Sequence, residues 1–84
     1  MDAYYFTFRS ITAAQTGAAC LERVGIRHVL LRTPRSMAKQ GCGYSLQVTP
    51  SAWRQVAALF LQEGIAFQRL FYLAQGQMPV EVPV

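Results

Sequence analysis

The chain has 84 residues, of which 52% are hydrophobic and 14% charged, and a formal net charge of +4 at pH 7. This length allows one domain with a modest two-layer core, and the composition excludes a disordered chain. No apolar stretch approaches the roughly 20 residues that cross a bilayer, and the first residues lack the pattern of a signal peptide. We therefore expect a cytoplasmic protein that does not bind membranes and keeps its two cysteines reduced.

The positive charge is concentrated in the middle of the chain. No acidic residue occurs between Glu22 and Glu63. This interval holds most of the basic residues: Arg23, Arg27, His28, Arg32, Arg35, Lys39 and Arg54. The distribution predicts a surface that attracts a small oxyanion, a nucleic acid or an acidic partner, and the alternative is a solvated basic face without a ligand.

The first half of the chain predicts a strand, a helix and a second strand. Residues 4–8, YYFTF, alternate with the period of two that is typical of a strand. Ser10 or Thr12 is the expected cap of the helix, and Gly25 is its expected end. The apolar side of this helix is formed by Ala14, Gly17 or Ala18, Leu21 and Val24. Residues 28–32 form the second strand.

The same plan recurs about 40 residues later, as in a duplicated half-domain. Residues 44–48 alternate as a strand, and Thr49 is expected to cap the second helix with Pro50 at its first position. Gly64 is the expected end of that helix. Its apolar side is formed by Trp53, Val56, Ala57 and Phe60.

A fourth strand follows, with Phe67, Phe71 and Leu73 expected on its inward face. The order βαββαβ predicts an α+β, ferredoxin-like sandwich of four antiparallel strands with two helices on one face. We expect this domain over residues 1–74 and a C-terminal tail over residues 75–84. Because valines alternate with other residues from 80 to 84, the tail is either extended along an edge strand or a partner, or disordered.

The stretch TPRSMAKQGCGYSL, residues 33–46, places one cysteine at the end of a cationic loop between the second and third strands. In the expected fold this loop lies at the same edge of the sheet as the turn before the first helix. Cys42 is therefore expected near Arg9, Ser10 and the N-terminus of that helix. The N–H groups of a helix N-terminus favour an anion, so they should lower the pKa of the thiol.

Other residues of the loop point in the same direction. Arg35 and Lys39 would stabilise a thiolate at Cys42, and Gly41 and Gly43 would leave room for another molecule to approach the sulfur. Two alternatives stay open. The GCG triplet can be a tight turn in which the cysteine is a small buried hydrophobe, and Arg35 can brace the loop by bonding main-chain carbonyls.

The remaining candidates for chemistry are weak. Cys20 lies in the first helix among small apolar residues, which indicates core packing, and its depth in the helix argues against a disulfide with Cys42. No pair of cysteines or histidines has the spacing of a metal site, and His28 is interpreted as a polar strand residue. We expect no metal, no cofactor, no paired carboxylates and no catalytic triad.

Residues 4–73 resemble the selenium/sulfur (Se/S) carrier-like family, which comprises small bacterial and archaeal domains formerly of unknown function. The resemblance is carried by YYFTF, by GI before the second strand, by TPR at residues 33–35 and by CG at residues 42–43. The family's arginine and cysteine are usually one residue closer, with a serine-rich spacer where this chain has SMAKQG.

The resemblance implies a carrier rather than an enzyme with turnover of its own. Cys42 would take a sulfur or selenium atom from a donor protein, hold it as a persulfide or perselenide, and pass it to an acceptor protein. The sequence does not choose between sulfur and selenium, and it leaves a homodimer open.

Two rival functions come from other classes of protein. The first is a regulatory or dimerisation module, in which Cys42 is incidental and the tail contributes to the interface. The second is single-stranded RNA binding, in which Tyr5 would stack on a base. Ser45 and Gln47 stand where this second function needs another aromatic residue, so nucleic acid is the weaker alternative.

Overall fold

A computed structural model describes residues 2–38 and 43–83. The elements follow the order β1 (Ala3–Phe8), α1 (Ile11–Arg23), β2 (Val29–Arg32), β3 (Tyr44–Val48), α2 (Trp53–Glu63), β4 (Arg69–Leu73) and β5 (Val80–Glu81). The strands form one antiparallel sheet in the order β2-β3-β1-β4-β5. The α+β class is confirmed, but the count of four strands is wrong because the tail adds β5. Neither of these helices has the length and apolar character needed to span a membrane.

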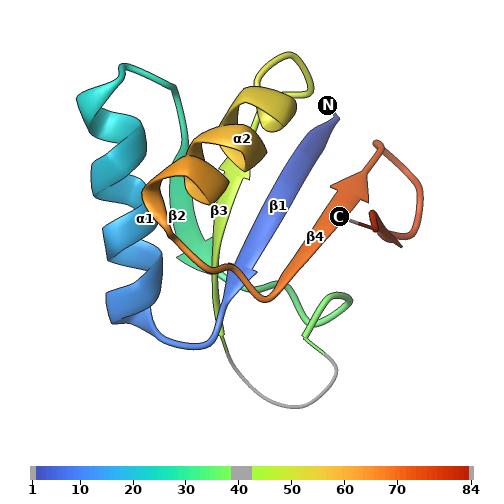
Figure 1. Ribbon diagram of the computed structural model, residues 1–84. Helices are drawn as coiled ribbons and strands as arrows, with labels where there is room; N and C mark the ends of the chain where they lie inside the picture. The colour runs from blue at the N-terminus through green and yellow to red at the C-terminus, as the bar shows by residue number, and fades with distance from the viewer. Residues whose placement is uncertain (1, 39–42, 84) are drawn as a thin grey trace.

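Both helices lie on the same face of the sheet (Figure 1), and the main core fills the space between the two layers. The register sets Phe6 of β1 between Leu46 of β3 and Leu70 of β4, and all three are fully buried. The helices contribute further buried side chains to the same cluster: Ala14, Cys20, Leu21, Val56 and Phe60. Cys20 is therefore a core residue, as the sequence predicts.

The opposite face of the sheet carries a smaller buried cluster of Ala3, Tyr5, Phe71 and Met37. Met37 comes from the connection between β2 and β3, is 4% exposed, and packs with the residues of β1 and β4. The expected inward orientation of Phe71 and its neighbour Leu73 is wrong, because Phe71 pairs with Tyr5 on this second face. The reason is local: residues 70–73 are all apolar, so alternation cannot decide which of them face the helices.

The helix boundaries agree with the sequence at three of four positions. Ser10 caps α1, and Gly25 and Gly64 follow the two helices with positive φ angles of 74° and 69°. The expected start of the second helix at Thr49 is wrong. The Thr49 hydroxyl bonds to Ser51 Oγ instead (3.1 Å), the chain makes a turn, and α2 begins only at Trp53 without a side-chain cap.

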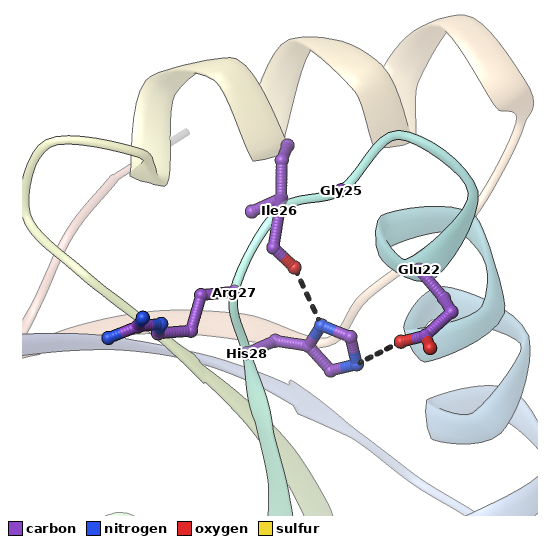
Figure 2. Close-up of a pocket in the computed structure, with 5 residues that line it drawn as sticks. All are labelled: Glu22, Gly25, Ile26, Arg27 and His28. Atoms are coloured by element: carbon purple, nitrogen blue, oxygen red, sulfur yellow. Dashed lines mark hydrogen bonds and ion pairs between the residues drawn. The ribbon is translucent and has the colours of Figure 1, made fainter.

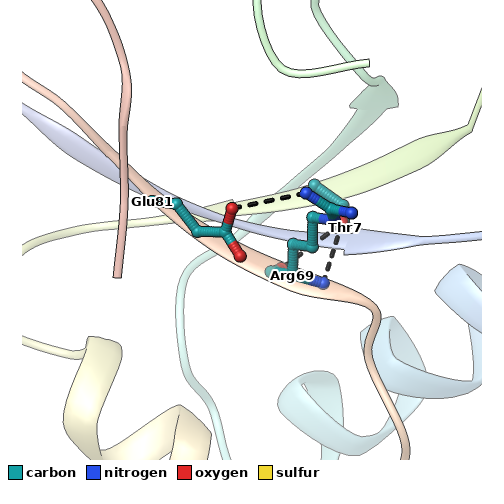
Figure 3. Close-up of polar contacts among 3 residues, drawn as sticks. All are labelled: Thr7, Arg69 and Glu81. Atoms are coloured by element: carbon teal, nitrogen blue, oxygen red, sulfur yellow. Dashed lines mark hydrogen bonds and ion pairs between the residues drawn. The ribbon is translucent and has the colours of Figure 1, made fainter. Parts of the chain in front are cut away.

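The C-terminal strand β5 lies along β4. Val80 pairs with Tyr72 and Glu81 with Phe71, and the N–H of Val82 donates to the carbonyl of Leu70 (2.8 Å). Figure 3 shows how the side chains reinforce this pairing: Arg69 Nη1 lies 3.3 Å from Glu81 Oε1. The tail was expected to be either extended along an edge strand or a partner, or disordered. Val80 and Glu81 are extended along the edge strand β4.

Candidate functional site

The candidate site is the edge of the sheet at which β1 and β2 end and β3, β4 and α1 begin, which we call the loop edge. It is the lower edge in Figure 1, where the connection between β2 and β3 leaves and re-enters the sheet. Arg32 of β2 pairs with Tyr44 of β3, and Phe8 of β1 pairs with the same tyrosine. Residues 8–10, 32–33 and 43–44 therefore meet at one place.

The N-terminus of α1 opens onto the loop edge. Ser10 has an extended backbone, and its Oγ accepts a hydrogen bond from the N–H of Ala13 (3.1 Å). The hydroxyl hydrogen of Ser10 is not used in that bond, so it can still be donated. The first turn of α1 contains no acidic residue. The partial positive charge of this helix end is thus not neutralised by a carboxylate from its own first turn.

Gly43 lies directly against the end of β1. A Cβ built on this residue would be 2.8 Å from the carbonyl oxygen of Phe8, closer than carbon atoms approach an oxygen in folded proteins. The carbonyl of Gly43 accepts a hydrogen bond from the N–H of Thr33 (2.9 Å). The sequence assigns this glycine to access around a sulfur atom. The structure gives it a second role, because only a residue without a side chain fits here.

The structure describes only part of the expected cluster of site residues. Arg9 and Ser10 are exposed at the loop edge. Arg35 is exposed in the turn that brings Met37 to the face of the sheet opposite the helices, and no bond from its side chain to a main-chain carbonyl is seen within residues 2–38 and 43–83. Lys39, Gly41 and Cys42 lie outside the described residues, so the predictions for these three residues and for their contacts stay predictions.

Three residues of the loop edge were missed from the sequence. The Arg32 guanidinium lies 5.6 Å from the centre of the Tyr44 ring, a cation–π distance. Arg69 begins β4 beside the end of β1, where its N–H donates to Thr7 Oγ1 (3.0 Å; Figure 3). Strand pairing brings these residues together from distant parts of the chain. The sequence placed Arg32 and Tyr44 at predicted strand ends, whereas Arg69 fell inside the expected fourth strand, between Phe67 and Phe71.

A shallow pocket of about 390 Å³ lies at the other end of α1, where it leads into β2. In Figure 2 the His28 ring lies between the Ile26 carbonyl, 2.9 Å from Nδ1, and Glu22, whose Oε2 is 4.0 Å from Nε2. The imidazole is mostly buried, with 14% of the side chain exposed. Across the described part of the chain, no group of three or more metal-ligating side chains occurs.

The chemistry available at the loop edge is the stabilisation of an anion. It offers a helix N-terminus, a serine hydroxyl and the guanidinium groups of Arg9 and Arg32.

A hydrogen bond to a carboxylate lies at the opposite end of β1 from the loop edge, where the hydroxyl of Tyr72 donates to Asp2 (2.8 Å). This bond raises the pKa of Tyr72 above its ordinary value of 10.0.

A comparison with known families matches residues 3–72 to a family described as "Putative Se/S carrier protein-like". Because the match covers most of the 84-residue chain, the protein belongs to this family. The matched range includes β1 to β3, both helices, the connection that contains Cys42, and all of β4 except Leu73. No curated protein and no solved structure matches the chain.

Proposed function

We propose that this protein is a sulfur or selenium carrier that holds the transferred atom on Cys42 as a persulfide or perselenide. The observation that carries the proposal is the family match over residues 3–72. The arrangement of the loop edge supports it, because Gly43, the neighbour of Cys42 in the chain, lies against the end of β1 two residues before the cap of α1.

The transfer step needs no oxidant or reductant beyond the donor. The Cys42 thiolate attacks the terminal, sulfane sulfur of a persulfide on a donor cysteine. The new sulfur–sulfur bond forms as the donor's bond breaks, and the donor cysteine leaves as a thiolate. The proton of the persulfide moves with the transferred sulfur. Delivery repeats the same exchange with an acceptor, and selenium in place of the sulfane sulfur gives the perselenide.

The roles of the surrounding residues follow from this step. Arg9 and Ser10 at the start of α1 stabilise the thiolate and the departing anion, and Arg35 and Lys39 of the loop assist them. Gly41 and Gly43 keep the approach to the sulfur open. Such a protein requires donor and acceptor partners but no catalytic turnover of its own, and it would act in the reducing cytoplasm.

We also infer that β1 to β4 and the two helices form a ferredoxin-like unit. The support is the strand order β2-β3-β1-β4 with both helices on one face. The RNA-binding alternative loses its main support, because Tyr5 is only 7% exposed and packs in the cluster that contains Met37. A base could not stack on this ring without displacing that cluster.

The test is persulfide loading followed by mass spectrometry. The reduced protein is incubated with glutathione persulfide, and each thiol is examined for a gain of one sulfur atom. We expect loading on Cys42 that Cys42→Ser abolishes, and unchanged loading in Cys20→Ser because Cys20 is buried. Loading that survives Cys42→Ser, or that never exceeds the level of a free cysteine peptide, would disprove the carrier function.

A further inference from the structure

The sheet ends on one side at β2, and among the described strands only β3 pairs with it. The residues at both ends of this strand are exposed, Val29 at 52%, and Leu30 and Leu31 between them are half-buried. In Figure 1, β2 is the outermost strand on the side of α1. A terminal strand presents a row of main-chain groups that can pair with another strand.

The hydrogen-bond pattern shows which residues of β2 have main-chain N–H and C=O groups that point to the outer edge of the sheet. The N–H of Thr33 donates to the carbonyl of Gly43 (2.9 Å), so these two residues form a hydrogen-bonded pair. In an antiparallel ladder such pairs alternate with pairs whose main-chain groups point away from each other. Counting back along the register, Leu31 and Val29 bond to β3, whereas the N–H and C=O groups of Leu30 and Arg32 point to the outer edge.

The opposite edge of the sheet is closed to such pairing. β5 has only two residues, Val80 and Glu81, and stands between Pro79 and Pro83. Proline has no N–H to donate, so prolines beside an edge strand block the growth of the sheet. β2 contains no proline. Among the described strands, β2 is therefore the edge that is available for strand addition.

The charged residues around β2 indicate which kind of strand could pair with its outer edge. Arg27 is exposed just before the strand and Arg32 is exposed at its end, so a guanidinium stands at each end of the ladder. The acidic residue at this end of α1 is Glu22, whose carboxylate faces His28 (4.0 Å; Figure 2). A second copy of β2 would bring two sets of arginines together, which is unfavourable. An acidic strand meets opposite charges at both ends.

We propose that the outer edge of β2 is a docking site for an extended acidic segment of a partner protein, which adds to the sheet beside Leu30. Main-chain bonds to Leu30 provide the pairing, and Arg27 and Arg32 provide the preference for acidic side chains. The inference does not depend on Cys42, and its test involves no sulfur chemistry.

The test uses synthetic peptides of about six residues, the usual length of a strand, in which glutamate alternates with valine. Amide shifts and amide hydrogen exchange are recorded by NMR on the full-length protein. In the free protein the Leu30 amide should exchange faster than those of Val29 and Leu31. The glutamate peptide should shift the amides of residues 29–32 in a saturable, salt-sensitive way and slow the exchange of Leu30.

Two controls sharpen the result. Arg27→Glu should weaken binding about fivefold to tenfold through lost attraction and added repulsion, and Arg54→Glu should leave it unchanged. Arg54 is the matched control because it is exposed on α2 and stacks over Trp53, 5.3 Å from the ring centre. Any of four results would overturn the proposal. The first two are equally tight binding of a lysine–valine peptide and amide shifts confined to residues 80–81. The others are the absence of a saturable shift at millimolar peptide and self-association of the protein through residues 29–32.

Discussion

The contact between Gly43 and the end of β1 is the tightest constraint that a single residue places on the loop edge. The requirement for glycine is steric, because the carbonyl oxygen of Phe8 lies 2.8 Å from the position that a Cβ would take. A main-chain atom inside a sheet cannot rotate away as a flexible side chain can. Residue 43 therefore fixes how closely the loop re-enters the sheet.

We predict that Gly43→Ala destabilises the protein by about 1–3 kcal/mol, the usual cost of forcing extra volume into a packed site. Chemical denaturation of the variant and the wild type gives the difference in unfolding free energy. Gly25 provides the contrast, since its φ is positive and a Cβ there meets nothing within 4 Å. Asparagine tolerates that conformation, so it should be milder than alanine at Gly25 but no better than alanine at Gly43. Equal behaviour at both positions would contradict the steric explanation.

At the scale of elements, the connection between β2 and β3 has a structural role that its polar composition does not suggest. Residues 34–38 form a turn in which the N–H groups of Met37 and Ala38 both donate to the Pro34 carbonyl (2.9 and 3.0 Å). This turn carries the Met37 side chain to the sheet face without helices, where it joins Tyr5 and Phe71. One methionine thus attaches the first part of the loop to the sheet.

We predict that Met37→Ala lowers the free energy of unfolding by about 2 kcal/mol, at the low end for a buried methionine because its cluster is small. Met78→Ala is the matched control. Met78 is 75% exposed, so its truncation should change stability by no more than about 0.5 kcal/mol. Thermal or denaturant unfolding of both variants measures the difference. If the two variants lose the same stability, Met37 does not anchor the loop.

At the scale of the whole molecule, the two edges of the sheet are treated differently. β5 covers β4, with its prolines and the Arg69–Glu81 ion pair closing that side. β2 is the last strand on the other side, and no described strand pairs with its outer edge. Strand addition at β2, as proposed above, would not polymerise the protein through both edges, because a sheet that grows on one side only cannot form a chain of copies.

We predict that removal of residues 78–84 promotes self-association, because it exposes the pairing groups of β4 and the apolar residues beside them. Light scattering after size-exclusion chromatography should show a larger mass that depends on concentration. Glu81→Gln keeps the strand and loses only the ion pair. This variant should have the same mass in solution as the wild type, and its free energy of unfolding should change by less than about 1 kcal/mol. A truncated protein with the mass of the full chain would show that β5 does not protect the edge.

The sequence determined the elements whose patterns are local. The alternation of YYFTF, the cap at Ser10 and the glycines after both helices each depend on a few neighbouring residues, and the structure confirms them. It also indicated the family, because the TPR and CG motifs are short and contiguous. Cys20 was assigned to the core from its apolar neighbours alone.

Tertiary structure decided the features that depend on distant residues. Residues 70–73 are uniformly apolar, so only pairing with β1 could set Leu70 toward the helices and Phe71 toward Met37. Pairing between β2 and β3 brought Arg32 and Tyr44 together at the loop edge, and pairing with β4 turned part of the tail into β5. Strand register and the choice of edge partner are set by long-range contacts, which no local periodicity contains.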